Sequence, residues 1–350
     1  MTAPTDPATP ASSAVPAGQA APDQAASSGS DAAGPAETGT GTASAADALT
    51  KKAGRNLYAA IPVALGLIAV FIVSLVWLPG LIVALVAVLV GRGLWELRRA
   101  FRTQAQIRIA FTPLVVGVAA TYLVAYLAAL PATAPDSAET DRAWWWRAWD
   151  LVHQALPAPA TAVVVGLALT GVVCLLWRLR RGADGYIRDV SASLFALVYV
   201  GLTASVLVLL LIRADGPALM AFFLLAIIGS DTGGYVAGLI FGKHKMAPSI
   251  SPKKSWEGFI GSLLLAPVGG LIVVAVALDV VWWRAVIVAE LIALAGICGD
   301  LVESVVKRDL GVKDLGGVIP GHGGVMDRID SYLVAAPVAW VAISLVMPYV

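Results

Sequence analysis

The chain has 350 residues, of which 59% are hydrophobic and only 13% are charged, and its formal net charge is +1. Soluble domains are nearer half apolar and a quarter charged, so this chain has too few polar residues to cover one large water-soluble core. The composition excludes an ordinary soluble globule and indicates a protein embedded in a lipid bilayer.

Residues 1–50 consist mainly of Ala, Thr, Ser, Pro and Gly, with five acidic residues and no Lys or Arg. This segment has too little large apolar surface to offset the entropy that folding costs, so we predict a disordered, low-complexity tail. It also lacks the basic start and apolar run of a signal peptide. Residues 51–350 are predicted to form one multi-pass membrane domain.

Apolar runs long enough to cross a bilayer follow one another from Leu57 onward. Every backbone amide must be hydrogen-bonded internally in lipid, so each run is predicted to be a helix and the fold class to be all-α. We expect about nine transmembrane helices, at 57–78, 80–95, 109–130, 161–177, 190–212, 217–241, 258–278, 281–298 and 332–350.

The basic residues predict how these helices are oriented. If the N-terminus lies in the cytoplasm, 20 Lys and Arg residues fall in cytoplasmic segments and four fall outside. Such a bias follows the positive-inside rule. We therefore expect a multi-pass protein of the inner (cell) membrane, with a cytoplasmic N-terminus and both conspicuous polar segments at the cytoplasmic face.

The first polar segment joins the sixth and seventh predicted spans. Asp231 lies within an apolar run, which is costly for a carboxylate unless it faces a polar cavity. The neighbouring Gly233 and Gly234 need not belong to such a cavity, because small residues also permit close helix packing. Lys253 and Lys254 precede a predicted helix. They could serve a functional site, but the positive-inside bias explains lysines at this position equally well.

The second polar segment begins at the end of the eighth span. Asp300, Glu303, Ser304 and Lys307 have the spacing i, i+3, i+4, i+7, so they share one face of a predicted helix, with Arg308 beside them.

A glycine-rich loop with Pro320 and His322 follows, and its backbone can approach a ligand closely. Asp327 and Asp330 then lie three residues apart at the start of the last span, again on one face.

This combination of residue types indicates a polyphosphate site. Clustered carboxylates without Cys, and with His322 alone nearby, suit a hard ion such as Mg²⁺. Neighbouring Lys and Arg side chains suit phosphate groups. The alternative is a solvated loop whose charges pair with one another.

At these residues the sequence resembles the phosphatidate cytidylyltransferases, also called CDP-diacylglycerol synthases. The signature of that family is matched by Ser304, Lys307-Arg308, Lys313-Asp314, Gly316, Pro320, His322-Gly323-Gly324 and Asp327-Arg328-Ile329-Asp330. The block Ser-Pro-Lys-Lys-Ser-Trp-Glu-Gly at 251–258 is also similar, although Ser255 stands where Thr is frequent and Gly234 where Ala is usual. The resemblance covers about residues 55–350.

The resemblance implies an enzyme that joins CTP to phosphatidate, giving CDP-diacylglycerol and pyrophosphate, with Mg²⁺ as cofactor. It implies that Asp300, Asp327 and Asp330 hold the metal and that Lys307 and Arg308 act on phosphates. Substrate binding is expected from Ser304, Lys253, Lys254, Asp231, Lys313, His322 and Arg328.

The expected partners are CTP, phosphatidate and the lipid bilayer, without nucleic acid, and a homodimer is left open. The alternatives are a CTP-using enzyme acting on another lipid, and an anion transporter.

Because CTP is soluble and phosphatidate stays in lipid, we expect a polar cavity open to both at the membrane boundary. Its predicted lining is Asp231, Lys253, Lys254, Asp300 and Asp327. Glu290, near the middle of the eighth span, is either a cavity residue or a sign that the span is drawn wrongly.

Overall fold

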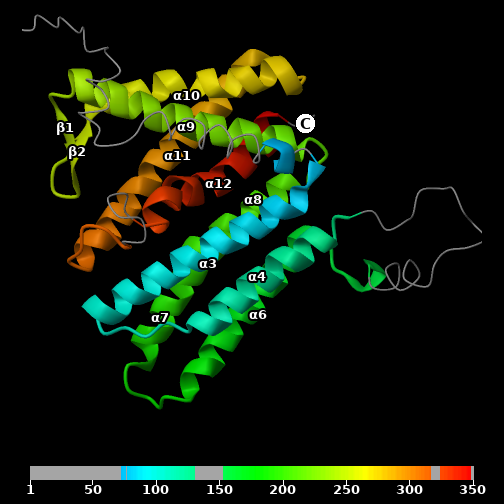
Figure 1. Ribbon diagram of the computed structural model, residues 1–350, viewed down its shortest axis with the longest axis vertical. Helices are drawn as coiled ribbons and strands as arrows, with labels where there is room; N and C mark the ends of the chain where they lie inside the picture. The colour runs from blue at the N-terminus through cyan, green and yellow to red at the C-terminus, as the bar shows by residue number, and fades with distance from the viewer. Residues whose placement is uncertain (1–71, 76, 131–152, 317–323, 348–350) are drawn as a thin grey trace, which may run out of the picture. The chain divides into compact units, whose positions relative to one another are not determined.

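The computed structural model describes residues 72–75, 77–130, 153–316 and 324–347. They form a set of packed helices with one short β-hairpin (Figure 1). The elements are α3 (Pro79–Gln104), α4 (Phe111–Leu127), α6 (Pro159–Leu179), α7 (Tyr186–Ala196), the π-helix η1 (Leu197–Leu202), α8 (Thr203–Leu211), α9 (Gly216–Phe241), β1 (Lys245–Ala247), β2 (Ser251–Ser255), α10 (Trp256–Ala277), α11 (Trp282–Asp309) and α12 (Met326–Val346).

The helices confirm an all-α polytopic membrane protein. Among the described residues, seven helical segments are long and apolar enough to cross a membrane, with α7, η1 and α8 counted as one, and α4 is a shorter apolar helix. These eight correspond to the second through ninth predicted spans. The tail at 1–50 and nearly all of the first predicted span lie outside the described residues.

Two helices run further than their apolar stretches suggested. Helix α3 continues past its predicted end at residue 95 to Gln104, and α11 continues past residue 298 to Asp309. The eighth span and the polar helix that follows it in the sequence are therefore one continuous element. This continuity holds Asp300 and Glu303 on a rigid extension of a membrane-spanning helix.

Close helix contacts depend on glycine where α9 and α10 lie side by side (Figure 1). A Cβ atom added to Gly233 would lie 2.2 Å from the carbonyl oxygen of Gly261, too close for any side chain. Small residues at this contact let the two backbones approach. The interpretation of Gly233 as a helix-packing residue is thus supported. Because Asp231 belongs to α9, this packing also places Asp231 close to α10.

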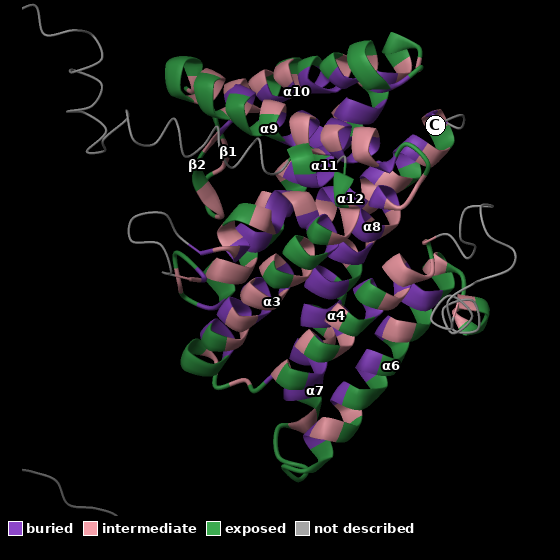
Figure 2. Cartoon of the chain, turned by 45° about the vertical axis from the view of Figure 1, so that its right-hand side comes forward, coloured by how far each residue is buried: buried purple, intermediate pink, exposed green. Residues whose placement is uncertain are grey.

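Figure 2 shows exposed residues along the outward faces of several helices, and many of these residues are large and apolar. On α10, Leu264 is 72% and Val276 is 83% exposed. Large apolar surface of this kind is unfavourable in water and suits contact with lipid chains. The burial pattern therefore agrees with the composition.

Contacts between distant segments define two ends of the helix set. At one end Glu96 of α3 accepts hydrogen bonds from the start of α12, and the backbone of Arg108 bonds Asp189 of α7. At the other end Arg213, after α8, bonds Ser344 near the end of α12. The polar segments predicted to carry chemistry lie at the first end.

Candidate active site

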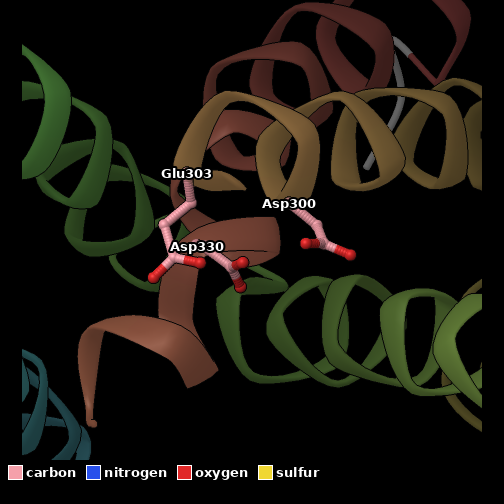
Figure 3. A group of neighbouring side chains, drawn as sticks. All are labelled: Asp300, Glu303 and Asp330. Atoms are coloured by element: carbon pink, nitrogen blue, oxygen red, sulfur yellow. The ribbon is translucent and has the colours of Figure 1, made fainter. Parts of the chain in front are cut away.

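Three carboxylates gather where α11 and α12 meet (Figure 3). Asp300 and Glu303 project from α11 and Asp330 from α12, and one oxygen of each lies within 4.8 Å of one from each of the others. Glu303 is fully buried and Asp330 is 6% exposed, whereas the side chain of Asp300 is 40% exposed. The cluster is thus buried on one side and open on the other.

Lys307 offsets part of this buried charge. Its ammonium group pairs with Glu303 and lies 3.0 Å from Oδ1 of Asp327. The other oxygen of Glu303, Oε1, is buried and has no hydrogen-bond partner among the described residues. A buried carboxylate oxygen without a donor is costly, so this atom is available for a cation.

Asp327, also expected among the metal ligands, lies next to this group of three, against Lys307 and Glu303. Its Oδ2 accepts a hydrogen bond from the backbone N–H of Gly324 at 2.7 Å, and its Oδ1 contacts Lys307. Glu303, which was not among the predicted metal ligands, lies with Asp300 and Asp330 in this group. Its position on the same helical face as Asp300 and Lys307 was the available signal.

An ion pair joins the two polar segments of the sequence. Nζ of Lys254 lies 2.9 Å from Oδ2 of Asp300 and donates to the carbonyl of Ile297 at 3.0 Å. A second link is formed by Nε of Arg308, which donates to the carbonyl of Ile250 at 3.2 Å. Segments that lie about 50 residues apart in sequence therefore form one site.

A β-hairpin positions the lysines. Strands β1 and β2 pair antiparallel, with Lys245 opposite Ser255. Ser255 then caps α10 by accepting a hydrogen bond from the N–H of Gly258 at 3.1 Å, which satisfies a free amide of the first turn. Strand and helix start are thus joined at one residue, which holds Lys254 beside α11.

A pocket of about 350 Å³ lies between α9, β2, α10 and α11. Four of the five residues expected to line a polar cavity do line it, namely Asp231, Lys253, Lys254 and Asp300. The fifth, Asp327, is not among its lining residues. The pocket therefore has acidic and basic side chains on facing elements, beside the carboxylate cluster.

Sequence reasoning missed Glu96, which orders the start of α12. This fully buried carboxylate on α3 accepts hydrogen bonds from the N–H groups of Val325 at 3.1 Å and Met326 at 2.9 Å. A negative charge at a helix start is favourable, and it also occupies free amides. The glycine positions make room for it, since a Cβ on Gly316 would lie 2.5 Å from the Glu96 carboxylate.

The remaining predicted residues are less closely engaged. Ser304 is buried and its hydroxyl donates to Asp300 at 3.4 Å. Lys313 and Arg328 are exposed, and neither lines the pocket. His322 lies outside the described residues. Glu290 lies within the continuous helix α11, with a buried oxygen that has no hydrogen-bond partner among the described residues, and it does not line this pocket.

Comparisons with known proteins identify the family. Residues 58–346 match the model of the cytidylyltransferase family. The chain is 37% identical over 309 residues to a phosphatidate cytidylyltransferase of Mycobacterium bovis, covering 85% of this chain and 91% of that protein. It is 35% identical over 312 residues to the phosphatidate cytidylyltransferase of Mycobacterium leprae, covering 85% and 90%. The resemblance seen in the motifs thus extends over most of the chain, and the chain belongs to the cytidylyltransferase family.

Proposed function

We propose that this protein transfers a cytidylyl group from CTP to phosphatidate, producing CDP-diacylglycerol and pyrophosphate. The observation that carries the proposal is the ion pair between Lys254 and Asp300, which puts the lysines of the pocket beside the carboxylate cluster, of which Asp300 also lines the pocket. The names of its relatives support the choice of substrates.

The carboxylate cluster fits a hard divalent cation. All three candidate ligands are oxygen donors, Oε1 of Glu303 has no partner among the described residues, and Asp300 opens toward the pocket. Asp300, Glu303 and Asp330 would hold the ion, and Mg²⁺ is the ion that such ligands and a polyphosphate favour. When bound, the ion would offset negative charge on the phosphates.

The basic residues would position the two substrates. Lys253 and Lys254 line the pocket and would contact phosphates of CTP, and Arg308 is exposed near the hairpin. Lys307 has both neighbouring acids as partners, so Asp327 would hold its ammonium group in place beside the cluster. Fixed positive charges of this kind lower the cost of bringing two anions together.

The reaction needs no activated side chain. The second pKa of a phosphate monoester is about 6, so the lipid phosphate is largely dianionic at neutral pH. One of its oxygens would form the new bond to the α-phosphorus of CTP while the bond from that phosphorus to the β-phosphate oxygen breaks. Pyrophosphate then leaves with the electron pair, and positioning and charge neutralisation provide most of the catalysis.

The protein would act at the cytoplasmic face of the inner membrane, with residues 51–350 as the catalytic domain. Lipid-facing helices would keep the acyl chains of phosphatidate within the bilayer, while the pocket opens at the end of the helix set that carries the basic segments. With this orientation, CTP would reach the pocket directly from the cytoplasm.

The test is an assay of the full chain, purified in detergent micelles with phosphatidate, Mg²⁺ and radiolabelled CTP. We expect labelled CDP-diacylglycerol in the lipid fraction and an equal amount of pyrophosphate. A polyprenyl phosphate and an ether-linked phosphatidate serve as alternative acceptors. Faster transfer to one of these, or phosphate transport by liposomes without any transfer, would overturn the proposal.

A further inference from the structure

A second charged pocket lies away from the carboxylate cluster, between α3, α4 and the end of α6. Its volume is about 280 Å³. Among the residues that the structure describes, four arginines line it together with apolar and aromatic side chains and one threonine, and no acidic residue does: Arg98, Arg102, Ile107, Arg108, Ile109, Phe111, Thr112, Trp177 and Arg181. Such a concentration of like charge is unfavourable without an anion.

The described part of the chain does not neutralise the side chains of these arginines. Among the described residues, none of Arg102, Arg108 and Arg181 has a salt bridge, and Arg98 lies over the ring of Phe111, with its guanidinium carbon 4.8 Å from the ring centroid. The acid that contacts this region, Asp189, is already engaged, since its carboxylate pairs with Arg178 at 2.9 Å.

The pocket is held in shape by buried hydrogen bonds. The linker between α3 and α4 is attached to α7 twice, because the N–H of Arg108 donates to Asp189 at 3.0 Å and the N–H of Ala110 to the hydroxyl of Ser193 at 2.9 Å. Arg108 therefore leaves a fixed backbone, and less order must be gained when an anion binds.

The start of α4 adds a further preference for negative charge. This helix of 17 residues has no side-chain cap and no acidic residue in its first turn, and Phe111 and Thr112 of that turn line the pocket. The N–H of Phe111 already donates to the carbonyl of Ile109 at 2.9 Å and Pro113 has no N–H, so it is mainly the helix dipole that favours an anion at this position.

We propose that this pocket binds the phosphate of an anionic phospholipid headgroup, at a site separate from the one where substrates react. Four guanidinium groups match a phosphate, and the neighbouring Ile107, Phe111 and Trp177 suit the glycerol and acyl region of a lipid. The pocket lies at the ends of membrane-spanning helices, where headgroups are found.

Lipid retention tests the proposal without relying on enzymatic activity. The full chain is placed in phosphatidylcholine nanodiscs containing phosphatidylglycerol, a phosphodiester lipid that lacks the monoester group required for the proposed reaction. Bound phosphatidylglycerol is then counted by native mass spectrometry. The pocket variant is R102Q/R181Q, and the matched control is R99Q/R180Q, which removes two charges from the same segments but none from the pocket lining.

We expect R102Q/R181Q to retain about fivefold less phosphatidylglycerol than the unaltered protein, and R99Q/R180Q to stay within about twofold of it, since charge-assisted contacts are lost only from the first. Equal losses would mean diffuse attraction and would overturn the proposal. Displacement of the lipid by millimolar inorganic phosphate would assign the pocket to a soluble anion and would overturn it too.

Folding is checked by thermal unfolding in phosphatidylcholine alone. If R102Q/R181Q unfolds earlier than its control, Arg108→Gln replaces it, because the Arg108 side chain is exposed and only its backbone holds the linker. The same reduction in retention is expected, and unchanged retention would contradict the proposal. A negative result in the lipid-retention experiment would not change the outcome of the cytidylyltransferase assay, so the two proposals are tested independently.

Discussion

Individual carboxylates at the site have different neighbours and should therefore respond differently to substitution. Glu303 and Asp330 lie in the carboxylate cluster, whereas Asp327 bonds Lys307 and the backbone of Gly324. Removing charge from the cluster should weaken binding of a divalent cation, and removing it from Asp327 should disturb Lys307.

We expect Glu303→Gln and Asp330→Asn to raise the Mg²⁺ concentration needed for half-maximal rate by about tenfold or more, a change of ~1.4 kcal/mol in binding. Asp327→Asn should abolish turnover at any Mg²⁺ concentration while the protein still inserts in the membrane. Mg²⁺ titrations of each variant measure this. Residual activity of Asp327→Asn that returns at high Mg²⁺ would instead make Asp327 a metal ligand.

The contact between Lys254 and Asp300 predicts a second residue-level effect. Lys254→Met removes a half-buried ammonium group from the pocket, and with it the ion pair to Asp300. We expect the KM for CTP to rise about tenfold or more, because one charge-assisted contact is lost. The matched control is Lys245→Met on β1, which does not line the pocket. A similar rise in both variants would show that only the overall charge matters.

At the scale of elements, the start of α12 depends on a carboxylate from another helix. Gly316→Ala would place a methyl group 2.5 Å from the Glu96 carboxylate, which two backbone N–H groups hold in place. We expect a loss of about 1–3 kcal/mol in the free energy of unfolding, typical of overpacking, and a fall in turnover.

Gly91→Ala on α3 is the control for this substitution, since its added methyl group would meet Val115 at an ordinary 3.8 Å. Alanine also favours a helix interior over glycine by about 1 kcal/mol, so this variant should be as stable or more stable. Thermal unfolding in detergent compares the two, and equal stability would argue against a tight fit around Glu96.

At the scale of the whole molecule, the charge bias predicts which ends of the helices face the cytoplasm. After Cys174 and Cys298 are replaced by Ala, single cysteines are introduced at Asp184, between α6 and α7, and at Asp279, between α10 and α11. Both positions are exposed. A membrane-impermeant maleimide added to intact cells should label only position 279, and position 184 only after the cells are opened. The reverse pattern would invert the proposed orientation.

Much of this organisation follows from the sequence alone, because it depends on local properties. Apolar runs of sufficient length predict the spans, and the period of the helix puts Asp300, Glu303 and Lys307 on one face whatever the helix contacts. The sequence likewise predicts that the lysines at 253 and 254 lie beside a helix start. The residue types also predict the chemistry, since clustered carboxylates without Cys suit a hard metal ion and neighbouring Lys and Arg residues suit a polyphosphate.

Which of these side chains meet depends on the packing of the helices. Whether Glu303 or Asp327 joins Asp300 and Asp330 depends on how α11 and α12 pack, which the spacing along either helix does not contain. Glu96 contacts Met326 across 230 positions of sequence, and the four arginines of the second pocket come from two separate stretches of the chain. Such contacts are set by packing between helices, which short-range sequence patterns do not encode.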